Sequence, residues 1–332
     1  MTSNMKKAKI KSFLIQILKL AFAVAIFVYL ITSGKVDLVR VKDAFLHSYW
    51  TILSLLMGLV TLLITTWRWR LLLTTQGIRI SFKKALKLVF IGHFFNIVIP
   101  GTVSGDVVKA YYISKTEKNK MAAALSVVMD RFIGLMMLTV VTFCAVIFNF
   151  SFVQSVSELK ILGQMIMGGF GIVVIGFLFF LFRKNFSLSS RWPIFLRDMT
   201  ESFWAYRKHL GVIFLAGIMT VINFIANVIL YYAAVRALGE NALPIAQYFF
   251  LLPLGMFVMS IPIAPAGLGV GQSAFLKLFE WAYGRPTTIG ADMMTIVQMV
   301  IVVWALVGLL VYVLNREKMP VNAPSEKEVL SV

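Results

Sequence analysis

Long apolar runs are the feature that most limits what this chain can fold into. A helix needs about 20 mostly apolar residues in a row to cross the hydrocarbon core of a bilayer. Six runs meet that length, and they cover residues 12–32, 49–67, 121–149, 161–182, 210–236 and 291–314. Because 60% of the 332 residues are hydrophobic and only 14% are charged, the sequence predicts an all-α polytopic membrane protein.

Two further apolar segments, residues 82–114 and 245–284, are interrupted. Each contains an apolar stretch too short to cross a bilayer, then prolines and glycines, then a polar residue and a second short helix. Broken backbone is tolerated at membrane depth only where it is buried in protein or lines a cavity. We therefore predict two re-entrant helical hairpins in addition to the six full spans. The residues that break them are Pro100, Gly101, Gly105, Pro262, Pro265, Gly267 and Gly269.

The spacing of the two hairpins predicts an inverted repeat. Residues 1–150 and 151–315 each consist of two spans, one broken hairpin and a third span, and the hairpins lie about half the chain apart. The first half starts on one side of the membrane and the second on the other, so the hairpins enter from opposite faces. Secondary transporters built this way bind their substrate between the two halves, near the bilayer midplane. Residues 316–332 are polar and are expected to form a disordered cytoplasmic tail.

The net charge of +18 is interpreted as the determinant of the protein's orientation in the membrane. Most Lys and Arg residues fall on one side of the predicted arrangement, so the positive-inside rule predicts a multi-pass protein of the cell membrane with both termini cytoplasmic. The basic residues lie between apolar runs and on no compact soluble domain, which argues against nucleic-acid binding. Residues 67–70, Trp-Arg-Trp-Arg, are expected to form an interfacial belt, and residues 191–208 to lie flat on the cytoplasmic interface.

Three charged residues within or next to the predicted membrane segments are candidates for a binding site. Arg131 lies well inside a span, where an unpaired charge is expensive. It either clamps a lipid phosphate or forms a structural ion pair with Asp106 or Asp130. Asp106 and Lys109 share one face of the half-helix after the first break, and Asp106 either caps that helix or faces a cavity. The backbone N–H groups near Gly105 are themselves expected to attract an anion.

The neutral polar residues complete the candidate site. Asn96 and His93 are one turn apart on the first half-helix, and each either lines the cavity or satisfies carbonyl groups freed near Pro100; a structural role is favoured for His93. Gln272 takes the place of Asp106 in the second hairpin. The predicted headgroup-binding set is Arg131, Lys109, Asp106, Asn96, Gln272 and Asp130.

The order and spacing of these residues resemble those of a known family. Its pattern is matched by Asn96-x-x-x-Pro100-Gly101-x-x-x-Gly105-Asp106-x-x-Lys109, Asp130-Arg131 and Pro262-x-x-Pro265-x-Gly267-x-Gly269. The family is the lysylphosphatidylglycerol synthase transmembrane region, also called flippase-like or UPF0104, and the resemblance covers nearly the whole chain. It implies movement of a lipid between leaflets. Larger relatives add an aminoacyl-transferase domain that these 332 residues do not match, so lysyl-lipid synthesis is not implied.

Three positions depart from the usual pattern of that family. Lys109 stands where Arg is common, and Asp130 and Gln272 stand where Glu is common. The change at Gln272 weakens the case for a proton-coupled role of the second hairpin.

Taken together, the sequence favours a translocator for a phosphate-bearing lipid, either an anionic phospholipid or a polyprenyl phosphate. A polyprenyl-phosphate-dependent transferase is the alternative, with Asp37 and Asp43 as its loop carboxylates, although no soluble segment is long enough to build an acceptor site. A scaffold for a partner lipid-modifying enzyme, small-solute transport and a homodimer also remain open. The chain has no catalytic motif, nucleotide loop or metal-ligand spacing, and only one cysteine. We therefore expect neither enzymatic activity nor a metal or cofactor.

Overall fold

The computed structural model describes residues 21–22, 24–98, 104–116, 120–182, 204, 206–240, 243–260, 264 and 267–315. Within these ranges the chain forms helices and no strand, so the predicted all-α class is confirmed. The helices are α2 (Leu38–His47), α3 (Tyr49–Thr75), α4 (Phe82–Val98), α5 (Ser104–Thr116), α6 (Lys120–Phe148), α7 (Phe150–Ser155), α8 (Ser157–Phe182), η1 (Tyr206–His209), α10 (Leu210–Ala237), α11 (Ile245–Ser260), α12 (Val270–Tyr283) and α13 (Ile289–Leu314).

Five helices of the described chain are long and apolar enough to cross a bilayer: α3, α6, α8, α10 and α13. They coincide with five of the six predicted spans. The remaining span, 12–32, is described only at residues 21–22 and 24–32, which are helical. Large apolar side chains such as Ile172 and Ile175 of α8, exposed to 74% and 69%, cover the outside of the protein. Such a surface is suited to lipid rather than to water.

Helix α3 is longer than predicted. The predicted span ended at residue 67, but the helix continues to Thr75. The expected interfacial belt is therefore wrong in part, because Arg68 and Trp69 are buried, with exposed fractions of 8% and 0%. Trp67 of the same segment remains exposed. The helix can bury Arg68 because a carboxylate on another helix compensates its charge.

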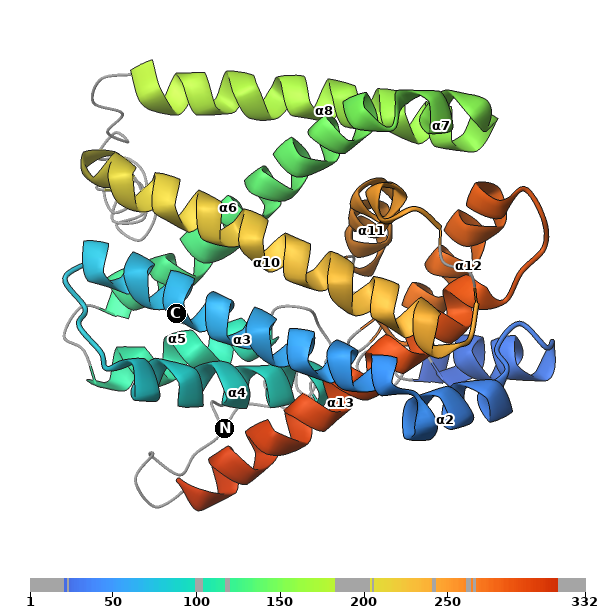
Figure 1. Cartoon of the computed structure of the whole chain (residues 1–332). Coiled ribbons are helices and arrows are strands. Elements are labelled where there is room, and N and C mark those ends of the chain that lie inside the picture. Colours follow the sequence, from blue (N-terminus) through green and yellow to red (C-terminus); the bar gives the residue numbers. More distant parts are fainter. Residues whose placement is uncertain are drawn as a thin grey trace, which may run out of the picture.

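Helices α3 and α10 form a central antiparallel pair (Figure 1). Ser54 of α3 donates to the carbonyl oxygen of Leu230 at 3.0 Å, while Arg68, further along α3, bonds to Thr220, earlier on α10. The end of α3 therefore lies beside the start of α10. Since α4 follows α3 and α11 follows α10, the two broken segments begin at opposite ends of this pair.

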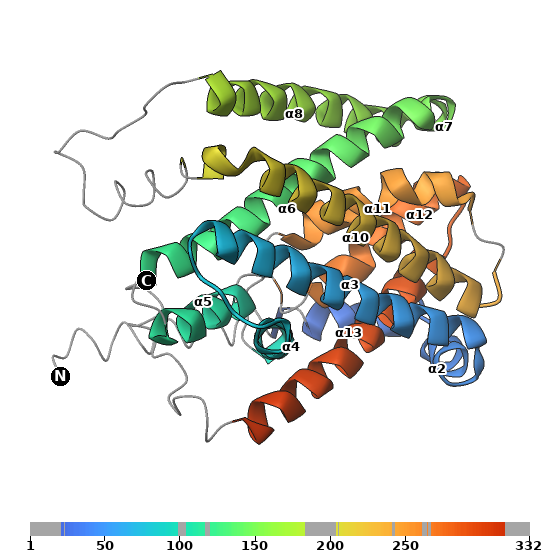
Figure 2. The same cartoon turned by 60° about the vertical axis from the view of Figure 1, so that its left-hand side comes forward.

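Both interrupted segments fold as two helices with a break between them. Helix α4 has 17 residues and α11 has 16, which corresponds to about 25 Å and is less than the bilayer core. Helix α4 packs against α5, and α11 packs against α12. The two hairpins lie toward opposite ends of the α3–α10 pair in both views (Figures 1 and 2). This arrangement suits the inverted repeat of 1–150 and 151–315, which stays a prediction.

Several predicted features lie wholly or partly outside the described residues. Pro100, Gly101, Pro262 and Pro265 lie outside the described residues, as does the tail from 316. Of the expected interfacial segment 191–208, only residues 204 and 206–208 are described. There the Tyr206 side chain is fully buried, and its hydroxyl donates to the carbonyl oxygen of Leu72 at 3.2 Å.

A close approach between α4 and α5 depends on two glycines. A Cβ atom added to Gly105 would lie 2.0 Å from the carbonyl oxygen of Gly92, a distance no side chain tolerates. The two half-helices can touch backbone to backbone only because neither residue carries a side chain. This contact brings the polar end of α5 beside α4 and sets the geometry of the site.

Candidate functional site

A cavity of about 410 Å³ lies among α3, α4, α5, α6 and α10. Five of the six residues predicted for the site line it, together with one residue that the sequence analysis assigned to the interface. These six are Arg68, Asn96, Asp106, Lys109, Asp130 and Arg131. Charged residues from three helices, α3, α5 and α6, thus converge inside an otherwise apolar bundle.

Asp106 is the centre of the charged cluster. The ammonium of Lys109 lies 2.6 Å from one carboxylate oxygen of Asp106, and the guanidinium of Arg131 donates to the other. The sequence left open whether Arg131 pairs with Asp106 or Asp130, and the structure selects Asp106. Asp106 and Lys109 are buried, with 7% and 6% exposed, whereas the Arg131 side chain remains 39% exposed. Arg131 is therefore the cation of this cluster most accessible from the cavity.

The second ion pair of the cavity was not predicted. Arg68 donates to the two oxygens of Asp130 at 2.7 and 3.0 Å, and its third nitrogen donates to the hydroxyl of Thr220 at 2.8 Å. This bidentate pair joins α3 to α6 and α10. Sequence reasoning placed Arg68 at the interface because it stands next to two tryptophans. One feature of the sequence could have predicted the pair. Arg68 and Asp130 each lie two turns or more from the basic end of their helix, so both side chains are expected at a similar depth in the membrane.

Asn96 holds the start of α5. Its side-chain carbonyl accepts a hydrogen bond from the backbone N–H of Gly105 at 2.7 Å and one from the Ser104 hydroxyl at 3.3 Å. Of the backbone N–H groups predicted to attract an anion, that of Gly105 is therefore already occupied by Asn96; the anion site stays a prediction. Capping by Asp106 is also not observed, since Lys109 and Arg131 hold that carboxylate. The close packing of α4 on α5 lets a side chain of α4 reach across to the helix end.

The comparisons with known proteins identify a family of membrane proteins. Residues 16–310 match the family described as lysylphosphatidylglycerol synthase TM region. The chain belongs to this family. It is similar to a UPF0104 membrane protein of Methanothermobacter thermautotrophicus, with 22% identity over 305 residues, or 82% of this chain and 84% of the relative. A UPF0104 membrane protein of Pyrococcus horikoshii is 38% identical over 69 residues, covering 20% of this chain and 21% of that relative.

In this member of the lysylphosphatidylglycerol synthase TM region family, the second hairpin does not contribute its polar residue to the charged cavity. Gln272 is completely buried, and its side-chain oxygen accepts from the backbone N–H of Gly269 at 2.8 Å. Gly267 and Gly269 turn the chain with φ values of 71° and 76° before α12 begins. Gln272 is thus used to start α12, and its predicted place in the headgroup cavity is wrong. The reason is local, because the glycine turn brings its own amide within reach of the side chain.

A second cavity of about 350 Å³ adjoins the charged one. The two share Thr61, Leu62, His93 and Asn227 in their walls. The second cavity continues between α3, α10, α11 and α13 and is lined largely by apolar side chains. His93, for which a structural role was favoured, therefore stands at the junction of a charged and an apolar compartment of this family member.

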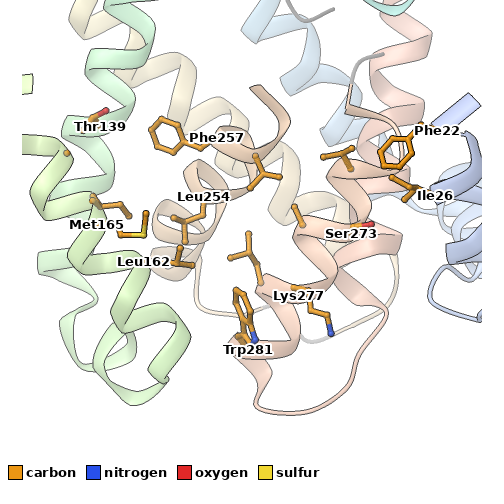
Figure 3. A pocket seen from close by; sticks show the side chains of 16 residues that line it. Phe22, Ile26, Thr139, Leu162, Met165, Leu254, Phe257, Ser273, Lys277 and Trp281 are labelled. Atoms are coloured by element: carbon orange, nitrogen blue, oxygen red, sulfur yellow. The ribbon is translucent and has the colours of Figure 1, made fainter. Parts of the chain in front are cut away.

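A third cavity, of about 820 Å³, opens on the other face of α11 (Figure 3). Figure 3 shows Leu254 and Phe257 of α11 facing Leu162 and Met165 of α8. Its walls are almost entirely apolar, and Lys277 is the charged residue in its lining. Such a groove suits hydrocarbon, and it is separate from the cavity that holds Asp106 and Arg131.

Proposed function

We propose that this protein is a lipid translocator that carries a phosphate-bearing lipid between the two leaflets. The observation that carries this proposal is the ion-paired cluster of Asp106, Lys109 and Arg131 in a cavity inside the bundle of long apolar helices. Charges at such depth are costly, and membrane proteins that keep them usually use them on a substrate pathway. Membership in the lysylphosphatidylglycerol synthase TM region family supports the proposal at the level of protein class.

Arg131 is the residue proposed to meet the phosphate. Its guanidinium is partly exposed, and guanidinium groups bind phosphate with paired hydrogen bonds. In the absence of a lipid, Asp106 pairs with both Arg131 and Lys109, and this cluster keeps one excess positive charge. A phosphate entering the cavity would bind the exposed side of Arg131 and balance this excess charge, while Asp106 keeps its pair with Lys109. The buried carboxylate is then not left without a partner.

The adjoining cavity supports passage beyond the charged cluster. Because Thr61 and Asn227 line both cavities, a headgroup held at Arg131 would pass these side chains to enter the compartment beside α11 and α13. That compartment reaches toward the second hairpin, which begins at the opposite end of the α3–α10 pair. Alternating access would then open the charged cavity to one leaflet and the α11 side to the other.

We also propose that the end of the protein where α3 meets α4 is cytoplasmic. Arg79, Lys83, Lys84 and Lys87 are exposed there, and Lys208 is exposed in η1, just before α10. The positive-inside rule assigns such a cluster to the cytoplasmic face of the cell membrane. The charged cavity is nearer to this end, so the lipid would be bound from the inner leaflet.

Transport in proteoliposomes tests the proposal. A fluorescent anionic phospholipid should exchange between leaflets faster with the protein than in protein-free vesicles. Arg131→Gln and Asp106→Asn should each slow the exchange by about tenfold, the effect of losing one hydrogen bond to a charged group. Asp43→Asn is the matched control, because Asp43 pairs with His47 on the surface, with 77% of its side chain exposed.

Two outcomes would contradict the translocator. One is exchange no faster than in empty vesicles. The other is unchanged exchange in Arg131→Gln together with a lower melting temperature, which would make the Asp106–Arg131 pair purely structural. Loss of function in Asp43→Asn with retention in Arg131→Gln would instead favour the transferase.

A further inference from the structure

We propose that the cavity selects a phosphodiester lipid whose headgroup is uncharged and rich in hydroxyl groups. This inference rests on the proposed function and narrows its substrate class. It follows from two properties of the cavity that are independent of each other. One is the balance of charge in its wall, and the other is a stripe of neutral polar side chains on α3 and α10.

The balance of charge favours a single negative charge. The cavity is lined by three cationic side chains, Arg68, Lys109 and Arg131, and two carboxylates, Asp106 and Asp130. With His93 counted as neutral, the wall carries one positive charge in excess. A phosphodiester has one negative charge and restores neutrality, whereas a phosphate monoester near pH 7 carries about −1.5 to −2. An uncompensated charge in a low-dielectric cavity is strongly disfavoured.

The cavity is poorly suited to a headgroup that also carries an ammonium group. Such a group needs a carboxylate, and both carboxylates of the cavity are already held by cations. Arg68 binds the two oxygens of Asp130, while Lys109 and Arg131 bind the two oxygens of Asp106. Recruiting either carboxylate would release a buried cation. An aminated headgroup is therefore expected to bind less well than a neutral one.

Helices α3 and α10 contribute four neutral hydrogen-bonding side chains to the wall of the cavity. Thr61 and Thr65 of α3 face the cavity, as do Asn223 and Asn227 of α10. The Asn227 amide donates to the side-chain oxygen of Asn223 at 3.0 Å, and the Asn223 amide donates to the Thr65 hydroxyl at 2.9 Å. Amides and hydroxyls each both donate and accept, which is the chemistry that hydroxyl groups of a ligand require.

This stripe runs along the direction of the proposed passage. Thr61, Thr65 and Arg68 are one turn apart on α3, so they form a line about 10 Å long. The line starts at the charged cluster and ends at the junction with the apolar cavity, where Thr61 and Asn227 line both compartments. A glycerol- or sugar-like headgroup extending from a phosphate at Arg131 would meet these side chains one after another.

Lipid retention measured by native mass spectrometry tests this inference. The purified protein is offered an equimolar mixture of phosphatidylglycerol, phosphatidic acid and phosphatidylethanolamine with identical acyl chains. These are a diester with a hydroxylated head, a monoester and a diester with an ammonium. Phosphatidylglycerol should be retained about fivefold over each of the others, an amount that one or two hydrogen bonds provide.

Variants of the neutral wall separate the two proposals. Asn223→Leu and Asn227→Leu keep the branching of the side chain at Cγ but remove its hydrogen-bonding groups, and should reduce the preference for phosphatidylglycerol to about twofold or less. Arg131→Gln should instead reduce retention of both anionic lipids. Thr32→Val is the control, because the Thr32 hydroxyl bonds only to carbonyl groups of its own helix, far along the chain from the cavity. Thermal unfolding verifies that each variant folds. If an asparagine-to-leucine variant does not fold, Asn223→Ser takes its place in the retention measurement.

Each result leads to one conclusion. Equal retention of the three lipids, or a preference unchanged by the asparagine variants, would overturn the headgroup inference and leave the translocator standing. A preference for phosphatidic acid would overturn the charge argument. Failure of the wild-type protein to retain any anionic lipid, or retention that Arg131→Gln leaves unaltered, would count against the proposed function itself.

Discussion

Arg68 binds both carboxylate oxygens of Asp130 across the interface between α3 and α6, at 2.7 and 3.0 Å. Both side chains are nearly buried, with 10% and 7% of their surfaces exposed. The same guanidinium reaches Thr220 on α10. One side chain thus connects three of the five long helices, and the charged cavity is built around this connection.

Removing one partner of that pair should destabilise the protein strongly. Asp130→Leu leaves the Arg68 guanidinium buried without its carboxylate, and such a change costs about 3–5 kcal/mol. The double variant Arg68→Met, Asp130→Leu should recover most of the loss, because no charge remains buried. Thermal unfolding in detergent, followed by tryptophan fluorescence, measures both. Additive losses in the double variant would show that the two residues do not act as a pair.

A single methyl group at Gly105 should force α4 and α5 apart. Gly105→Ala would bring its Cβ atom to 2.0 Å from the carbonyl oxygen of Gly92, and backbone must move to relieve the clash. We expect a loss of about 1–3 kcal/mol, typical of overpacking, and slower lipid exchange. Gly176→Ala on α8 is the control, since nothing lies within 4 Å of its Cβ position. A Gly105→Ala protein as stable as Gly176→Ala would disprove the close contact.

The hydrogen bond from Gly105 to Asn96 should behave as a helix cap. Asn96→Ala removes the acceptor at the start of α5 and is expected to cost about 1 kcal/mol. Asn96→Asp keeps an acceptor oxygen in the same place and should preserve the cap. The melting temperatures of the two variants, compared at equal detergent concentration, decide the matter. Equal destabilisation of both variants would show that the hydrogen bond from Gly105 to Asn96 does not stabilise the start of α5.

The two hairpins should return to opposite faces of the membrane. Lys115, near the end of α5, and Arg285, just after α12, are both exposed. After Cys144→Ala removes the single native cysteine, Lys115→Cys should react with an impermeant thiol reagent from the cytoplasmic side only. Arg285→Cys should react from the outside only. Labelling of both from one side would refute the inverted arrangement of the halves.

The long helices were predictable because the thickness of the bilayer sets the minimum length of an apolar run that can cross it. Helix α10 matches its predicted span within one residue, and the two broken segments form the helix pairs that their prolines and glycines indicated. The family resemblance rested on the same local features, and residues 16–310 confirm it. Local sequence also brought Arg131, Lys109, Asp106, Asn96 and Asp130 into one candidate set.

The partners within that set depended on the tertiary structure. Charge and hydrogen-bond partners are chosen by which helices touch and at what depth, and spacing along one helix carries no information about this. The sequence predicts Arg68 at the membrane interface, whereas packing of α6 on α3 brings Asp130 within hydrogen-bonding distance of it. Asn96 can accept from the Gly105 amide because Gly92 and Gly105 allow α4 and α5 to approach closely. Gln272 was expected in the cavity but bonds to its own turn. The sequence by itself determined which residues must be buried in the membrane, and packing alone decided what each of them binds.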